Sequence, residues 1–527
     1  MKINYIDIRN RRIFPAEIII KDGLIESVRE IEEEVEDYVC PGFIDAHVHI
    51  ESSMLTPENF GKLVLSRGTL AVVTDPHEIA NVCGLSGIEF MMESAKSSPI
   101  YNFFTIPSCV PATDMDVSGA SITSDDVSLL VDKYKFYALS ELMNVPGVLN
   151  GDEEVMRKID LAKSHGLVVD GHAPLCSGDA LKKYISAGVT TDHEASFLSE
   201  ATEKIKLGMK ILIREGSAAR NFDTLSSLIG EYSDSLMFCT DDSHPDMIVE
   251  KGHIDRMVRR AVAEAYDLFD VLKIACLNPK DHYKLPIGEL RVGDSADFIV
   301  LEDLKNFNIK ECYVKGMMVF SQEKGVELSK ISSEFTGVAP INNFNHDLLE
   351  LSDLSDSPSG VLDVIGIIDG TLITDALKFY APFGKDDGVQ KIVYLNRYTN
   401  GQAQIAYVKG FNLKRGAIAS SISHDSHNIL AVGADDASIL SAINELIRYK
   451  GALVLNDGTA NFSLPLSIGG IMSPESGDIV AGAYKSLSNK VLEMGCTLQA
   501  PFMTLSFLAL VVIPHIKIGE NGVVKVE

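Results

Sequence analysis

"PGFIDAHVHIESS", residues 41–53, places a short apolar run directly before two histidines that are one residue apart, His47 and His49. If residues 43–50 form a β-strand, alternate side chains point to opposite faces, so both imidazoles project to the same side. Two imidazoles on one side of a strand can chelate a metal ion. The same pattern also suits a strand with two polar residues on an exposed face, so the rest of the chain has to decide.

Eight apolar, β-rich runs occur between about residue 41 and residue 280, and most of them stop at a polar residue. Helix-compatible stretches, such as EEVMRKIDLAKSHG at residues 153–166, lie between most of these runs. Eight strand–helix units in about 240 residues match the size of a (β/α)8 TIM-like barrel, although a doubly wound open sheet would show the same alternation. The runs span residues 43–50, 70–76, 101–109, 136–142, 167–173, 189–194, 210–217 and 236–242.

The flanking segments predict further domains, because a chain of 527 residues is too long for one ordinary core. Residues 1–40 and 281–330 carry similar strand-like pieces that could not fold alone, so we expect one small β-domain built from both sides of the barrel at residues 41–280. Residues 331–360 are polar and turn-rich and predict a linker. Residues 361–527 mix strand and helix signals and predict an additional α+β C-terminal domain. The fold class is therefore α/β.

Composition limits the class of partner. The formal charge of −27 repels phosphate backbones and argues against nucleic acid. The 8 cysteines include no CxxC pair and the N-terminus does not resemble a signal peptide, which predicts a cytoplasmic setting. The longest apolar stretch, at residues 502–514, is shorter than the ~20 residues that span a bilayer, so we expect a core element and no membrane association. We also expect a homo-oligomer.

Histidines and carboxylates stand at the ends of several predicted strands. The carboxyl ends of barrel strands share one face of the molecule, so these side chains should converge there. Divalent transition metals prefer imidazole and carboxylate ligands, and six such ligands exceed what one four- or five-coordinate ion needs, so we predict two ions. The residues are His47 and His49 at the first strand, Glu141 at the fourth, His172 at the fifth, His193 at the sixth and Asp241 at the eighth.

These strand ends, together with the flanking KDGLIESV and GELRVGDSADFIVLEDL, resemble the amidohydrolase superfamily. More narrowly, DAHVHIESSMLTP, DPHEIANVCG, GVTTDHE, FCTDDSHP and SHDSHNILAVG resemble the adenine deaminases of bacteria and archaea, and the resemblance runs over nearly the whole chain. It implies a purine-salvage hydrolase that converts adenine to hypoxanthine and ammonia. A metal-activated hydroxide would attack purine C6.

The resemblance also implies roles at the metal centre. The two histidines of the first strand and Asp241 would bind the more buried ion, and His172 and His193 would bind the second. Glu141 matches the position where many relatives carry a carboxylated lysine that bridges both ions, so Glu141 would bridge by itself. The resemblance favours Mn²⁺, while imidazole and carboxylate ligands without a thiolate also suit Fe²⁺ or Zn²⁺.

Proton transfer needs further groups. Asp241 is predicted to act also as the general base that takes the proton of the attacking hydroxide and passes it on. Glu194 and Glu78 are the candidates for protonating purine N1, and each could instead orient the histidine next to it in the sequence. His77, in DPHE, could be structural or catalytic. The SHDSHN segment at residues 423–428 could form a third metal site, a wall of the substrate pocket or a hydrogen-bonded loop.

Two alternative functions fit the same fold. The ligand set also suits hydrolysis of a cyclic amide, as in hydantoinase- or dihydroorotase-like relatives, because metal ligands report the reaction type and not the substrate. A catalytically dead barrel could serve as a scaffold. Such a scaffold would have no need to keep every metal ligand, whereas here the set is complete.

Overall fold

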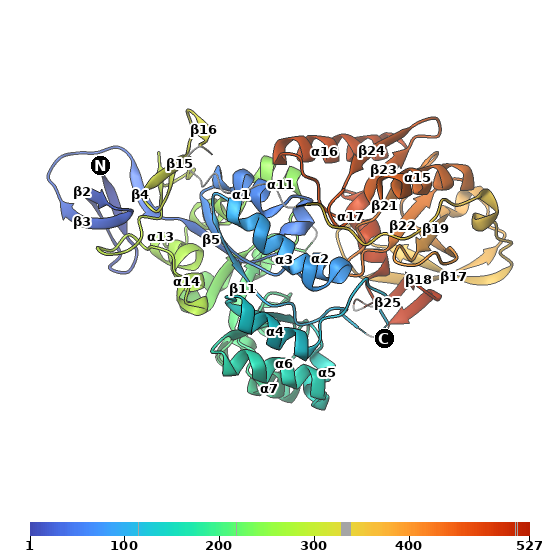
Figure 1. Ribbon diagram of the computed structural model, residues 1–527, viewed down its shortest axis with the longest axis horizontal. Coiled ribbons are helices and arrows are strands. Elements are labelled where there is room, and N and C mark those ends of the chain that lie inside the picture. Colours follow the sequence, from blue (N-terminus) through green and yellow to red (C-terminus); the bar gives the residue numbers. More distant parts are fainter. Residues whose placement is uncertain (114, 218, 328–338, 512, 514, 527) are drawn as a thin grey trace.

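The computed structural model describes residues 1–113, 115–217, 219–327, 339–511, 513 and 515–526. Figure 1 shows a small β-domain near the N-terminus, a central part in which strands and helices alternate, and a C-terminal domain at the opposite end of the long axis. The central part carries the predicted functional residues.

Eight parallel strands form the wall of the central part. They pair in three short sheets that are joined by single parallel bridges. The bridge between Val48 and Asp241 returns from the last strand to the first and closes the wall. Closure excludes an open doubly wound sheet and confirms the predicted (β/α)8 barrel. The strands are β5 (Phe43–Val48), β6 (Thr69–Thr74), β7 (Tyr101–Phe104), β8 (Ala138–Leu142), β9 (Val168–Gly171), β10 (Thr191–Asp192), β11 (Lys210–Arg214) and β12 (Leu236–Cys239).

Helices follow the strands and surround the wall (Figure 1). They are α1 (Pro57–Leu65), α2 (His77–Cys83), α3 (Leu85–Ser94), α4 (Ser124–Lys133), α5 (Val145–Asn150), α6 (Glu153–Ser164), α7 (Gly178–Ala187), α8 (Leu198–Lys206), α9 (Phe222–Leu225), α10 (Ile229–Tyr232), α11 (Pro245–Lys251), α12 (Ile254–Ala263), α13 (Leu268–Leu272) and α14 (Asn278–Tyr283).

Several strands end earlier than the sequence predicts. The seventh run was expected to continue to residue 217, but β11 ends at Arg214, and β7 likewise ends at Phe104 rather than at residue 109. The reason is visible after β11, where the Arg214 N–H donates to the side chain of Asn221 at 2.7 Å instead of to a neighbouring strand. The next N–H, that of Glu215, still donates to the Cys239 carbonyl at 3.1 Å, and the chain then leaves the ladder and forms the loops at the barrel mouth.

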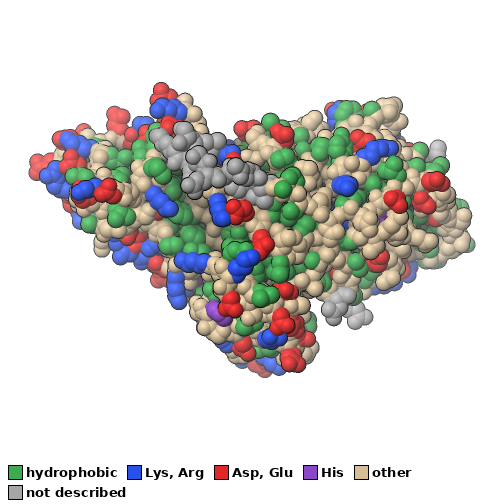
Figure 2. Space-filling view, viewed as in Figure 1, with side chains coloured by type: hydrophobic (Ala, Val, Ile, Leu, Met, Phe, Trp, Pro, Cys, Tyr) green, Lys and Arg blue, Asp and Glu red, His purple; other side chains and the backbone are tan. Residues whose placement is uncertain are grey.

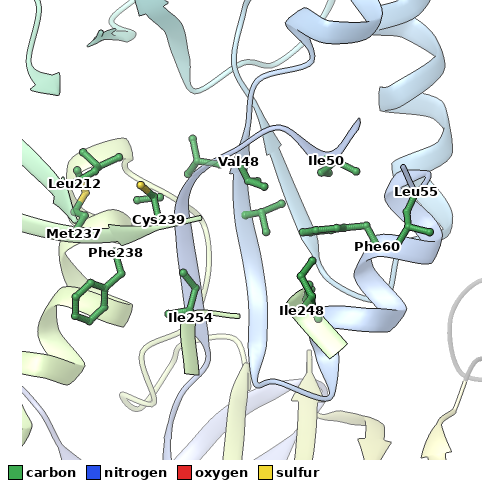
Figure 3. Close-up of a cluster of buried hydrophobic side chains, with 14 of the residues drawn as sticks. Val48, Ile50, Leu55, Phe60, Leu212, Met237, Phe238, Cys239, Ile248 and Ile254 are labelled. Carbon is green, nitrogen blue, oxygen red and sulfur yellow. The ribbon is translucent and has the colours of Figure 1, made fainter. Parts of the chain in front are cut away.

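The barrel wall is apolar and tightly packed. Figure 3 shows Leu212, Met237, Cys239 and Val48 from adjacent strands in one cluster with Phe60 and Ile248 from the surrounding helices. Fully burying a side chain of this kind contributes roughly 1.5–3 kcal/mol. Gly42 lets the chain enter the barrel, because a Cβ at this position would lie 2.3 Å from Leu70 Cγ. The PGF sequence thus positions the first histidine strand.

The strands outside the barrel on both sides form one sheet, in the order β16-β15-β14-β13-β4-β1-β2-β3. The two flanks meet where β4 pairs with β13, with Tyr38 opposite Leu301 and Pro41 opposite Phe298. The strands are β1 (Lys2–Asp7), β2 (Arg12–Lys21), β3 (Leu24–Glu30), β4 (Tyr38–Pro41), β13 (Phe298–Leu301), β14 (Ile309–Val314), β15 (Met317–Ser321) and β16 (Gly325–Val326).

The segment predicted as a linker, residues 331–360, lies partly outside the described residues, which resume at residue 339. Residues 339–350 form neither helix nor strand. Asn343 Nδ2 donates to the Val82 carbonyl of the barrel at 3.1 Å, and Asn342 Nδ2 donates to the Lys450 carbonyl of the C-terminal domain at 2.7 Å. This segment therefore contacts both domains.

The C-terminal domain contains an eight-stranded mixed sheet in the order β18-β17-β20-β19-β22-β21-β23-β24. Helix α15 packs on one face of this sheet, and α16 contacts α11 of the barrel. The elements are β17 (Gly360–Ile367), β18 (Thr374–Ala381), β19 (Val389–Leu395), β20 (Gln404–Lys409), β21 (Ala417–Ser420), β22 (Ile429–Gly433), α15 (Asp436–Tyr449), β23 (Ala452–Asn456), β24 (Asn461–Pro465), α16 (Gly477–Glu493), α17 (Pro501–Ser506), β25 (His515–Gly519) and β26 (Gly522–Val526).

Basic and acidic side chains are interspersed over the face of the molecule shown in Figure 2. Within the described ranges, the helices are too short or too polar to cross a membrane. The apolar stretch at residues 502–514 supplies the buried part of α17 and the following turn, and residues 512 and 514 lie outside the described part of the chain.

Candidate metal centre

The histidines of the first strand lie buried at its carboxyl end. Asp45 of the same strand accepts hydrogen bonds from the Thr240 N–H (3.1 Å) and hydroxyl (2.5 Å), which fixes β5 against the chain that follows β12. His49 Nδ1 lies 3.1 Å from the Asp75 carbonyl oxygen, so its Nε2 is left for another partner. The buried Nε2 of His47 has no hydrogen-bond partner among the described residues. Both Nε2 atoms are therefore available to a metal ion.

The second histidine pair follows β9 and β10. His172 Nδ1 lies 2.8 Å from Glu141 Oε2, and His193 Nε2 lies 3.2 Å from the same oxygen. The buried Lys204 ammonium donates to Asp192 Oδ2 (2.9 Å) and to the carbonyl next to His172 (2.7 Å). One buried cation thus holds both histidine loops in place.

Glu141, on β8, divides its two oxygens between the two pairs. Its Oε1 lies 3.1 Å from His49 Nε2 and 3.7 Å from His47 Nε2. Its Oε2 faces His172 and His193 at the distances given above. One oxygen for each pair is the arrangement that a carboxylate bridging two metal ions requires.

Asp241 follows β12 and meets the first pair from the other side. Its Oδ1 lies 3.1 Å from His49 Nε2, and its Oδ2 accepts a hydrogen bond from Arg214 Nη1 at 2.6 Å. Burial by itself raises the pKa of Asp241, but the Arg214 charge and the neighbouring histidines hold that pKa well below its usual value. Burial likewise raises the pKa of Glu141, and hydrogen bonds from His172 and His193 outweigh it, so that this pKa also lies well below the usual range. Both carboxylates are anionic at neutral pH.

This donor set fits two divalent metal ions. The ligand atoms of His47, His49 and Asp241 lie within 4.8 Å of one another, as do those of His47, Glu141 and His193. Nitrogen and oxygen donors without a thiolate suit Mn²⁺, Fe²⁺ and Zn²⁺. An unpartnered buried imidazole nitrogen beside anionic carboxylates is a preformed cation site. The structure therefore brings all six predicted ligands together.

His77 lies closer to this centre than its sequence context indicates. Its Nδ1 lies 2.8 Å from Asp75 Oδ2 and 3.4 Å from Glu141 Oε1, and its ring lies 4.4 Å from the His49 ring. His77 therefore forms one wall of the site, between the Glu141 carboxylate and the C-terminal domain.

Glu194 lies beside the second histidine pair. Its Oε1 lies 3.4 Å from His193 Nε2 and bonds to the Arg214 guanidinium. Burial opposes the charge, but Arg214 and then the histidines lower the pKa of Glu194 to about 2. This carboxylate is accordingly held in its ionised form.

Glu78 faces the C-terminal domain instead. It lies in the first turn of α2, and its two oxygens bond to His424 Nδ1 and His427 Nε2. The SHDSHN segment thus reaches the barrel mouth and contacts one of the predicted proton donors.

Two functional residues were not identified from the sequence. Arg214, which joins Asp241 to Glu194, lies within the apolar run at residues 210–217 and reads as part of a strand. The expectation that functional residues follow strand ends would have identified Arg214 only if β11 had been predicted to end at residue 214. Asp75, which holds His77, directly follows β6 and could have been found by that rule.

Comparisons with known proteins agree along the whole chain. Residues 38–319 match the amidohydrolase family, and residues 374–527 match the adenine deaminase C-terminal domain. Similar curated proteins include an adenine deaminase of Methanosarcina barkeri (44% identical, 98% of this chain and 96% of the relative) and one of Sulfurovum sp. (46%, 99% and 97%). An adenine deaminase of Borreliella burgdorferi is 44% identical over 100% of this chain and 98% of its own.

Proposed function

Because the chain belongs to the amidohydrolase family and matches adenine deaminases over its full length, we infer that it hydrolyses adenine to hypoxanthine and ammonia. Water supplies the oxygen that replaces the amino group at C6, and the amino group leaves as ammonia. The observation in the structure that best supports this hydrolysis is the carboxylate of Glu141, whose oxygens face one histidine pair each. The same relatives give no support to hydrolysis of a cyclic amide or to a scaffold without activity.

We propose that the site holds two divalent ions, with Mn²⁺ as the resident metal. His47, His49 and Asp241 would hold the first ion, the two later histidines the second, and Glu141 would bridge them. When bound, such ions supply Lewis acidity that lowers the pKa of water toward neutrality. The preference for Mn²⁺ rests on family resemblance, and the donor set is compatible with it.

We propose that Asp241 accepts the proton of the attacking water and delivers it to the departing amine. Its position supports this role, because Arg214 holds Oδ2 while Oδ1 faces the first histidine pair. The arginine keeps its own charge throughout, so it fixes the orientation of the carboxylate without competing as a proton donor.

Glu194 and Glu78 are the two proposed sources of the N1 proton. Glu194 is paired with the Arg214 guanidinium, which stabilises the ionised form of Glu194. A guanidinium cannot donate a proton at neutral pH, so Arg214 cannot supply one to Glu194. Burial opposes the charge of Glu78, but His424 and His427 hold its pKa well below the usual range, so Glu78 is ionised as well. Its partners are imidazoles, which, unlike a guanidinium, exchange protons near neutral pH, so a proton can reach N1 from these histidines through Glu78. This difference between the partners favours Glu78 over Glu194.

The test is an assay of metal-replete protein with adenine, guanine and a hydantoin, following ammonia release and the ultraviolet spectrum of the purine. We expect ammonia and hypoxanthine from adenine only. Hydantoin opening without adenine turnover would contradict the proposal. The cytoplasmic setting, the homo-oligomer and the absence of nucleic-acid partners stay predictions from the sequence.

A further inference from the structure

A second polar cluster lies between the barrel and the C-terminal domain. It consists of His424, Asp425 and His427 from the loop between β21 and β22, together with Glu78 and His77 at the start of α2. Each of these side chains is buried, with at most 10% of its surface exposed. The cluster adjoins the metal centre through His77, whose Nδ1 lies 3.4 Å from Glu141 Oε1.

Three atoms of this cluster have no hydrogen-bond partner among the described residues: His77 Nε2, His424 Nε2 and Asp425 Oδ2. His77 Nε2 lies 3.6 Å from Glu78 Oε1 and 3.8 Å from Asp425 Oδ1, and both distances are too long for a hydrogen bond. Buried polar atoms are nearly always paired, because each unpaired one costs free energy. Three such atoms on adjacent residues indicate a place where a polar ligand completes the hydrogen bonds.

The free oxygen of Asp425 needs a hydrogen-bond donor. The carboxylate faces the imidazoles of His77 and His424. It also faces the carboxyl of Asp116, whose pKa burial and then the charge of Asp425 raise to about 7. A carboxylate oxygen only accepts hydrogen bonds, so an N–H donor is the favoured partner for Asp425 Oδ2.

The loop is held rigidly from several sides. The His424 ring stacks on Phe507 with 4.7 Å between centroids and an interplanar angle of 10°. The Tyr398 hydroxyl donates to the Ser426 carbonyl at 2.6 Å, and Asn428 Nδ2 donates to the Val117 carbonyl of the barrel at 2.7 Å. A loop fixed in this way can present its free atoms to a ligand without an ordering cost on binding.

We propose that Asp425 and His424 recognise the edge of the purine base that carries N3 and N9. This proposal rests on the proposed deamination of adenine. With C6 directed to the metal centre, the far edge of the base points toward the C-terminal domain. That edge carries an N–H at N9 and an acceptor nitrogen at N3. Asp425 Oδ2 accepts the N–H. His424 in its imidazolium form, which the Glu78 and Asp425 carboxylates stabilise, donates from Nδ1 to Glu78 and from Nε2 to the acceptor nitrogen. A nucleoside has no N–H at N9, so these two residues select the free base.

The test compares adenine with 9-methyladenine, which cannot donate at N9, in Asp425→Ala and in the isosteric Asp425→Asn. Asp375→Asn, an exposed position on β18, is the matched control. For each protein we measure kcat/KM, or the inhibition constant where an analogue is not turned over, together with the metal content and the melting temperature. Asp425→Asn gives the answer if Asp425→Ala does not fold.

We expect Asp425→Ala to lower kcat/KM for adenine by about 100-fold, the worth of a hydrogen bond to a charged group, and to leave 9-methyladenine within about threefold. The preference for adenine should then fall by a similar factor, with metal content unchanged. An unchanged preference, an equal loss for both compounds or the loss of a bound metal ion would each overturn the inference. A wild-type protein inactive on adenine would instead overturn the proposed function itself.

Discussion

Glu141→Gln keeps the shape of the side chain on β8, but it removes the charge and turns one oxygen into an NH₂ group. In the structure one carboxylate oxygen faces the histidines of β5 and the other faces His172 and His193. Whichever way the amide turns, one histidine pair meets a group that cannot bind a metal ion. We therefore expect the variant to lose one of its two ions.

The electrostatic magnitude supports this expectation. Two dications about 4 Å apart repel each other by about 17 kcal/mol at an effective dielectric constant of about 20. A carboxylate carries about half a charge on each oxygen, and an oxygen at roughly 2.1 Å gives about 8 kcal/mol of attraction to its own ion on the same scale. The two nearer oxygens together give about 16 kcal/mol, so the bridge offsets most of the repulsion. A neutral amide restores little of this. Losing only about 4 kcal/mol of this attraction lowers the affinity for the second ion by about 1,000-fold.

The assay is metal analysis of the purified variant after exhaustive dialysis, followed by kcat/KM for adenine and thermal unfolding. We expect about one ion or fewer, activity lower by several orders of magnitude, and a folded protein. Glu153→Gln, an exposed substitution in the first turn of α6, is the matched control. Two tightly held ions with near wild-type turnover in Glu141→Gln would show that the bridge is elsewhere.

Three further outcomes are expected. Chelation should abolish deamination and about two equivalents of metal should restore it, whereas full activity in demetallated protein would exclude a hydrolytic metal mechanism. Adenosine should be turned over poorly or not at all, since ribose occupies N9, and equal kcat/KM for adenine and adenosine would contradict this. Lys517 is fully buried and donates to the Leu372 carbonyl at 2.9 Å, and burial lowers its pKa to about 8. The pKa of Lys517 in the folded state lies below the unfolded value of about 10.4, so between these two values the unfolded state binds the extra proton. The buried lysine therefore lowers the free energy of unfolding by its full amount below about pH 8 and by nothing above about pH 10.5. Lys517→Met should therefore raise the free energy of unfolding by about 3 kcal/mol at pH 7 and by little at pH 10.5, and equal stability at pH 7 in denaturant titrations would refute this.

The strand-end rule predicted which side chains converge because barrel geometry directs the carboxyl ends of all eight strands to one face. His47, Glu141 and Asp241 are distant in sequence, yet each lies one or two residues from the end of a short apolar run. The closed barrel and the family were accordingly predictable from the sequence.

The partners of Glu78 were not predictable in this way. His424 and His427 are 346 and 349 residues away, on a separate sheet, and no local period links them to α2. Arg214 was hidden for another reason. Its position at the end of β11 depends on the Asn221 side chain, which accepts the Arg214 N–H, and the sequence pattern does not show that contact. Contacts between domains and the positions of strand ends depend on tertiary packing.

The pairing of β4 with β13 has a consequence for synthesis of the chain. β4 can join β1 as soon as both have been made, but its other edge has no partner until Phe298 is added, roughly 260 residues later. At about 5–20 residues per second, this edge waits roughly 13–50 s. An unpaired edge can recruit other strands, so a ribosome-bound chain is open to misassociation during that interval. The entire barrel is synthesised in the meantime. The first strands of the N-terminal sheet are therefore translated before the barrel, but the sheet is completed only after it.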